Sequence, residues 1–166
     1  MADITLKGNP VRTHGNLPSV GSKAPDFRLV DKDLHDRTLK DYAGKRKLIS
    51  IVPSLDTATC SLSTKKFNEK IANHPEVSVL VVSADLPFAQ KRMCEAEHAE
   101  NVIALSMMRS KDFGKDYGVL IETGPLAGIC ARAVVVLDEQ DRVVYTQLVP
   151  EITQEPDYEK ALKALL

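Results

Sequence analysis

The stretch KLISIVPSLDTATC, residues 47–60, contains the end of one structural element and the start of another. Residues 47–52 form an apolar, largely β-branched run of the kind found in buried central strands. Pro53 cannot donate a hydrogen bond to a neighbouring strand, so it ends the run. From Cys60 to Ala72 apolar residues recur at helical spacing and share one face. A buried strand that leads through a short loop into a helix favours an α/β fold.

Strands and helices alternate on both sides of this stretch. We expect further strands at residues 27–30, around Thr38-Leu39, and at 77–82, 102–105, 131–137 and 142–148, and further helices at 87–98, 111–117 and from Pro156 onward. The last two strands are joined too closely for a crossover, so they form a hairpin. A second hairpin is expected at the N-terminus, where Gly8-Asn9-Pro10 makes a turn. This order predicts an α/β, thioredoxin-like fold of mixed strand direction with an N-terminal β-hairpin extension.

Length and composition are those of an ordinary globular domain. The chain has 166 residues and a mass of 18.3 kDa, so we expect one domain over residues 1–166. With 22 basic and 23 acidic residues the net charge is -1, which favours neither nucleic acid nor an anionic membrane as a partner. We find neither a membrane-spanning apolar stretch nor a secretory signal, and we therefore expect a cytoplasmic protein.

The three cysteines, Cys60, Cys94 and Cys130, are too few for a disulfide scaffold. Cys60 stands at the expected start of a helix, where unpaired N–H groups and a partial positive charge favour a thiolate. Thr57 can place a hydroxyl toward the sulfur or toward an attacking oxygen, and Pro53 fixes the backbone. The pattern points to Cys60 as a reactive thiolate.

The motif P-x3-T-x2-C, present as Pro53, Thr57 and Cys60, resembles the active-site motif of the peroxiredoxins. The longer string SLDTATC, residues 54–60, is similar to that of the thiol peroxidase subfamily, the atypical two-cysteine peroxiredoxins. Further blocks match the subfamily's pattern at residues 124–128, 131–138 and 151–158. The resemblance therefore covers essentially the whole chain.

The resemblance implies a role for each matching residue. Cys60 corresponds to the peroxidatic cysteine, which becomes a sulfenic acid as it breaks the O–O bond. Cys94 occupies the position of the resolving cysteine, which would form an intramolecular disulfide with Cys60. Thr57 would hydrogen-bond the peroxide, Pro53 would shield the site, and Arg132 would hold the thiolate and polarise the peroxide.

The resemblance also implies the substrates and partners. We expect reduction of hydrogen peroxide and organic hydroperoxides, recycling by thioredoxin, a homodimer, and no metal, haem, flavin or nucleotide cofactor. One residue departs from the family's pattern: Thr59 precedes the cysteine, where an aliphatic residue is common. Its hydroxyl is a candidate for tuning the thiolate.

Other interpretations stay open. The same cysteine chemistry would serve a redox sensor that passes its disulfide to a partner protein, and the fold would also serve a binding module without catalysis. Cys94 and His98 have the spacing of half a metal site on a helix. Cys130 lies two residues before Arg132, so on a regular strand it would face the active site. We prefer to interpret Cys130 as a buried small hydrophobe.

Overall fold

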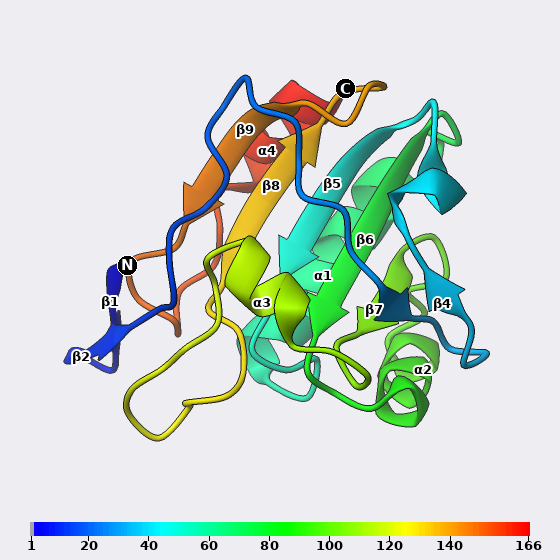
Figure 1. Cartoon of the computed structure of the whole chain (residues 1–166). Coiled ribbons are helices and arrows are strands. Elements are labelled where there is room, and N and C mark those ends of the chain that lie inside the picture. Colours follow the sequence, from blue (N-terminus) through cyan, green and yellow to red (C-terminus); the bar gives the residue numbers. More distant parts are fainter. Residues whose placement is uncertain (1) are drawn as a thin grey trace.

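The computed structural model describes residues 2–166 and contains a mixed sheet with helices on both faces (Figure 1). The seven-stranded sheet has the order β4-β3-β7-β6-β5-β8-β9, and β1 and β2 form a separate hairpin. The strands are β1 Asp3–Leu6, β2 Asn9–Arg12, β3 Leu29–Val30, β4 Asp36–Arg37, β5 Arg46–Ile51, β6 Val77–Ser83, β7 Ile103–Ser106, β8 Ala133–Leu137 and β9 Val143–Leu148. The helices are α1 Ala58–Ile71, α2 Pro87–Ala96, α3 Asp112–Asp116 and α4 Tyr158–Leu165, with a 3-10 helix at Leu39–Tyr42.

Strand direction changes within the sheet, as the sequence predicts. β5, β6 and β7 are parallel to one another, whereas β8 pairs antiparallel with β5 and β9 antiparallel with β8. The expected closing hairpin and the expected N-terminal hairpin are both confirmed. The prediction of a thioredoxin-like fold with a hairpin extension is therefore confirmed.

Alternate side chains of each central strand face two different parts of the core. In β5, Leu48 belongs to the apolar cluster that contains residues of α1 and α4, and Ile49 belongs to the cluster that contains residues of α3. Figure 1 shows α1 and α4 behind the sheet and α3 in front of it. The buried run at the centre of the sheet is apolar on both faces because helices cover both.

Three element boundaries differ from the prediction because of capping. Thr57 is the N-cap of α1, and its side chain accepts a hydrogen bond from Cys60 N at 3.3 Å, which places Cys60 inside the first helical turn. The short strand expected around Thr38-Leu39 lies just before it, as β4 Asp36–Arg37, because the Asp41 carboxylate accepts a hydrogen bond from Thr38 N at 2.8 Å and a 3-10 helix begins at Leu39. C-terminally, Asp157 caps α4, so that helix starts after Pro156.

α2 is shorter than predicted and ends at Ala96. His98 has a positive φ of 53°, so it does not continue the helix, and the helical spacing of Cys94 and His98 is lost. Within residues 2–166, no group of three or more His, Cys, Asp or Glu side chains has an arrangement that could hold a metal ion. None of the helices described is long and apolar enough to cross a membrane.

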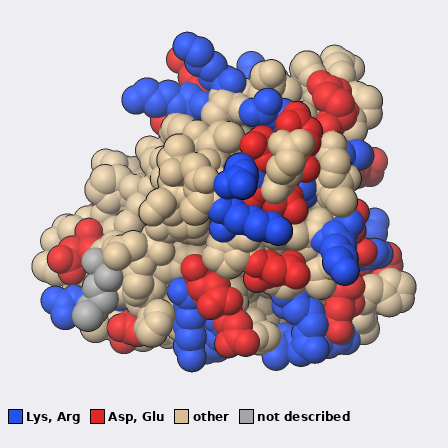
Figure 2. Space-filling view, turned by 45° about the horizontal axis from the view of Figure 1, so that its top comes forward, with Lys and Arg blue, Asp and Glu red and all other residues tan. Residues whose placement is uncertain are grey.

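The surface carries charges of both signs. Figure 2 shows acidic and basic side chains interspersed over much of one face, with a broad uncharged area on its left side. This mixture agrees with the net charge of -1.

Candidate active site

Cys60 lies in the first turn of α1, at the carboxyl end of β5, and its side chain is fully buried. Its backbone is held on both sides. The N–H donates to the Thr57 hydroxyl oxygen at 3.3 Å, and the carbonyl accepts a hydrogen bond from Ser63 Oγ at 3.0 Å. The sulfur therefore occupies a fixed position at the positive end of a helix.

Arg132 reaches this sulfur from the segment just before β8. Arg132 Nη1 lies 3.1 Å from Cys60 Sγ, and Arg132 Nε donates to Ile152 O at 2.9 Å. Only 3% of Arg132 is exposed, and a buried cation is costly unless it has partners. The guanidinium is always charged and its donors have a rigid geometry, so the arrangement holds a fixed cation against the sulfur. The resemblance to the peroxiredoxins implied this contact, and β8 itself starts one residue after Arg132.

Residues 150–152, whose Ile152 carbonyl accepts the hydrogen bond from Arg132, are bonded to the N-terminal hairpin. Thr5 N donates to Pro150 O at 2.8 Å, and Ile152 N donates to Thr5 O at 2.9 Å. The Glu151 carboxylate accepts hydrogen bonds from the backbone N–H groups of Thr153 and Gly8, which lower its pKa to about 2. The carbonyl that orients the arginine is thus held by residues from the other end of the chain.

Thr57 and Pro53 lie beside the cysteine on the loop between β5 and α1. Pro53 is buried and Thr57 is exposed. The Thr57 hydroxyl donates to Ser54 O at 3.2 Å while it accepts from Cys60 N, so it already fixes the loop and the helix start. One acceptor site on this oxygen is left over for a third group.

Thr59 stands directly before Cys60 in the first turn of α1. Its hydroxyl donates to Thr153 O at 3.1 Å and ties α1 to the segment that also receives Arg132. This contact gives the hydroxyl a structural role in joining α1 to residues 150–153, and its effect on the thiolate stays a prediction.

Sequence reasoning missed Asp85, which organises the active-site loop from the end of β6. Its carboxylate accepts hydrogen bonds from Ser54 Oγ and from Leu55 N, each at 2.7 Å, and from Ser83 Oγ at 2.7 Å. The signal was present, because Asp85 follows a buried strand parallel to β5 and therefore lies at the same edge of the sheet. Hydrogen bonds to a charged carboxylate are stronger than those between neutral groups.

We expect Asp85→Ala to loosen this loop. Ser54 Oγ and Leu55 N would lose their acceptor, and the free energy of unfolding should fall by about 1 to 3 kcal/mol. Urea denaturation and the second-order rate of peroxide reaction measure the two effects, and both should decrease. Asp56→Ala is the matched control, because Asp56 lies on the same loop and its carboxylate accepts no hydrogen bond within residues 2–166. Equal stability of the two variants would show that Asp85 does not hold the loop.

Cys130 faces away from the active site. It is fully buried in the cluster that contains Ile49, and its sulfur lies 3.6 Å from Met107 Sδ. Burial raises the pKa of the Cys130 thiol to about 12. The arrangement on one face with Arg132 does not occur, because the regular strand begins only at Ala133. The interpretation of Cys130 as a buried small hydrophobe is confirmed.

Cys94 lies on α2 and is partly buried. Both Cys94 and Cys60 are free thiols. It shares a gap of about 10 Å³ with Ser61 and Thr64 of α1, so the two helices meet at this point. Burial raises the pKa of the Cys94 thiol, and the nearby positive charge of Lys32 opposes this shift in part. The structure therefore places Cys94 on the helix next to that of Cys60, without a bond between the two sulfurs.

Comparison with known proteins finds the same similarity over nearly the whole chain. The Redoxin family matches residues 19–162. A thiol peroxidase of Leptospira interrogans serogroup Icterohaemorrhagiae serovar copenhageni (strain Fiocruz L1-130) is 52% identical over 166 residues, 99% of this chain and 97% of that protein.

Solved structures agree. A peroxiredoxin-like protein from Aquifex aeolicus has a TM-score of 0.90 and 46% identity, with 99% of this chain and 96% of that chain covered. A thiol peroxidase from Chromobacterium violaceum has a TM-score of 0.91 and 26% identity, with the same coverage of 99% and 96%.

Proposed function

Because this chain belongs to the Redoxin family and is a thiol peroxidase of the peroxiredoxin type, we propose that it reduces hydrogen peroxide and organic hydroperoxides through Cys60. The observation that carries the proposal is the distance of 3.1 Å between Arg132 Nη1 and Cys60 Sγ. The thiolate is the nucleophilic form of cysteine, and a fixed cation beside the sulfur favours it.

In the proposed reaction the Cys60 thiolate attacks one oxygen of the peroxide and the O–O bond breaks. The sulfur keeps that oxygen as a sulfenic acid, and the other oxygen leaves as water or an alcohol after it takes up a proton. Arg132 polarises the bound peroxide, and buried Pro53 shields the sulfur from water. Thr57 accepts a hydrogen bond from the peroxide through the acceptor site that its own contacts leave over.

We expect Thr57→Val to slow peroxide attack by about five- to tenfold, since a hydrogen bond of about 1 to 1.5 kcal/mol is lost. The helix cap is lost as well, at a cost of about 1 kcal/mol in stability. Stopped-flow kinetics with hydrogen peroxide measure the first effect and urea denaturation the second. Thr57→Ser keeps the hydroxyl and should retain most of the activity. A valine variant that reacts as fast as the serine variant would remove Thr57 from the mechanism.

Cys94 completes the proposed cycle. Its thiol attacks the Cys60 sulfenic acid, an intramolecular disulfide forms, and water is released. Thioredoxin then restores both thiols by two successive exchange steps, so that its own dithiol becomes a disulfide. We propose that the cycle runs in a cytoplasmic homodimer and without a cofactor.

We expect this disulfide to require local unfolding. A disulfide needs Cα atoms about 4.4–6.8 Å apart, whereas packed helices have axes about 8–10 Å apart. The Cys60 side chain, in α1, points toward Arg132. Cys94 lies on a different helix, α2. Peptide mapping should find a Cys60–Cys94 bridge within one chain, and amide exchange should rise across residues 58–66 or 88–98 on oxidation. A disulfide-linked dimer as the main product, or unchanged exchange in both segments, would contradict this expectation.

Peroxide consumption with thioredoxin and its reductase tests the function as a whole. Many turnovers per protein molecule support the proposed peroxidase cycle. A single turnover supports the redox sensor, and the absence of reaction supports a binding module.

A further inference from the structure

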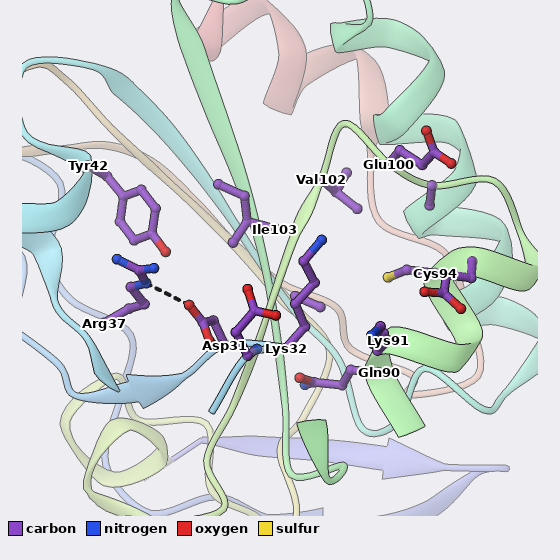
Figure 3. A pocket seen from close by; sticks show the side chains of 14 residues that line it. Asp31, Lys32, Arg37, Tyr42, Gln90, Lys91, Cys94, Glu100, Val102 and Ile103 are labelled. Carbon is purple, nitrogen blue, oxygen red and sulfur yellow. Dashed lines mark hydrogen bonds and ion pairs between the residues drawn. The ribbon is translucent and has the colours of Figure 1, made fainter. Parts of the chain in front are cut away.

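A pocket of about 520 Å³ lies between α2, β7 and residues 31–42 (Figure 3). Its volume is within the range of small-molecule sites, about 300–1,000 Å³. Figure 3 shows the sulfur of Cys94 pointing into the pocket, opposite the strands. The pocket therefore places a thiol in contact with a space that a small molecule can enter.

Gln90 supplies an independent sign of a ligand on the floor of this pocket. The side chain is fully buried, and its Nε2 donates to Ser83 Oγ at 3.0 Å and to Leu105 O at 2.8 Å. The bond to a carbonyl fixes which end of the amide is nitrogen, so Oε1 is an acceptor. This oxygen is buried without a hydrogen-bond partner, and a buried unpaired acceptor is costly. The pocket therefore suits a ligand that brings an N–H donor.

The charges around the pocket indicate that the ligand carries both signs. Two lysines and three acidic residues line it, Lys32, Lys91, Asp33, Glu95 and Glu100, whereas Arg37 is already paired with Asp31 at 2.7 Å. A ligand with only one sign of charge would meet like charges on one side. A ligand with an ammonium group for the Gln90 oxygen and a carboxylate for a lysine would satisfy both.

We propose that the pocket binds the symmetrical disulfides of small amino-acid thiols, each half of which carries an ammonium and a carboxylate group, and that Cys94 forms a mixed disulfide by exchange with them. In this step the Cys94 thiolate attacks one sulfur of a symmetrical disulfide and the S–S bond breaks. The second half leaves as a thiolate, which takes up the proton that Cys94 lost to solvent. One disulfide is consumed and one is formed, so no further oxidant is needed.

This inference goes beyond the proposed peroxidase cycle, because it concerns the reduced protein with α2 intact. Cys60 and Cys130 are fully buried, so Cys94 is the cysteine that this pocket exposes to a small disulfide. A protein capped at Cys94 retains the Cys60 thiolate but has no free thiol to resolve its sulfenic acid. The small thiol would thus suspend the cycle reversibly.

Three probes with matched carbon chains test the proposal in the Cys60→Ser protein. Cystine carries ammonium and carboxylate groups, cystamine carries ammonium groups alone, and dithiodipropionate carries carboxylates alone. The rate of mixed-disulfide formation is followed by intact mass and normalised to the rate of each probe with the urea-unfolded protein. We expect the normalised rate of cystine to exceed those of the other two by about tenfold, as for one added hydrogen bond to a charged group.

Variants assign this preference to the pocket. Gln90→Met should remove most of the advantage of cystine over dithiodipropionate, and Lys32→Gln most of its advantage over cystamine. Lys163→Gln, on α4, is the control and should leave both ratios unchanged. Peptide mapping should place the adduct on Cys94 in the wild-type protein as well. Equal normalised rates for the three probes, or ratios that the pocket variants leave unchanged, would overturn the proposal. The peroxide assay with wild-type protein tests the proposed function separately.

Discussion

The Cys60→Ser protein is expected to fold normally and to consume no peroxide above the uncatalysed background. Serine is close to cysteine in size and fits the fully buried site beside Arg132. Its hydroxyl is not ionised at neutral pH, so the protein has no nucleophile to attack the O–O bond. Circular dichroism and urea denaturation check the fold, and the thioredoxin-coupled assay checks turnover.

Cys130→Ala is the matched control for this loss. It also removes a fully buried thiol, but one in the cluster on the opposite face of the sheet. Turnover and disulfide pattern should stay close to those of the wild type, with a modest loss of stability from the space left in the core. Turnover of the Cys60→Ser protein above a few per cent of wild type, or a mapped Cys60–Cys130 bridge, would refute the assignment of the nucleophile.

Arg132→Met should slow peroxide attack by about 10²–10³-fold, the usual effect of removing one preorganised charged donor from a reaction centre. Methionine fills a similar volume but removes the cation 3.1 Å from the sulfur. Alkylation of Cys60 by iodoacetamide at neutral pH should slow as well, because less of the cysteine is thiolate. Stopped-flow kinetics and alkylation rates are the two measurements.

Arg132→Lys separates charge from geometry. Lysine keeps the charge but not the planar fork that contacts Cys60 and Ile152 O together, so we expect a rate between those of the wild type and the methionine variant. If the Arg132→Met and wild-type proteins have the same rates of alkylation and of reaction with peroxide, Arg132 has only a structural role. Urea denaturation identifies any variant that fails because it does not fold.

Local patterns in the sequence were sufficient for the centre of the fold. The apolar run 47–52 and the helical spacing after Cys60 correspond to β5 and α1, since a buried strand and an amphipathic helix each have their own periodicity. The same strand–loop–helix context, with the motif of Pro53, Thr57 and Cys60, located the candidate nucleophile. Arg132 came from the resemblance to a family, and the structure places it against the sulfur.

The remaining features depend on contacts between segments far apart in the chain. Asp85 is recognisable only once β6 is known to lie beside β5, because its partners are on another loop. Cys130 was expected to face the same way as Arg132, but the chain is not a regular strand at that point and the periodicity of two does not apply. His98 lies outside α2, which ends at Ala96, because its φ of 53° is not helical.

The links between Thr5 and residues 150–152 have a consequence for the order in which the molecule is completed. Thr5 is synthesised long before residues 150–152, the segment that it holds. Ile152 O, which orients Arg132, can therefore take its place only after residues 5–152 have emerged from the ribosome. Pairing of segments 145 residues apart in the sequence is a slow, non-local event in folding. Arg132 is thus fixed against Cys60 only after this pairing, late in folding.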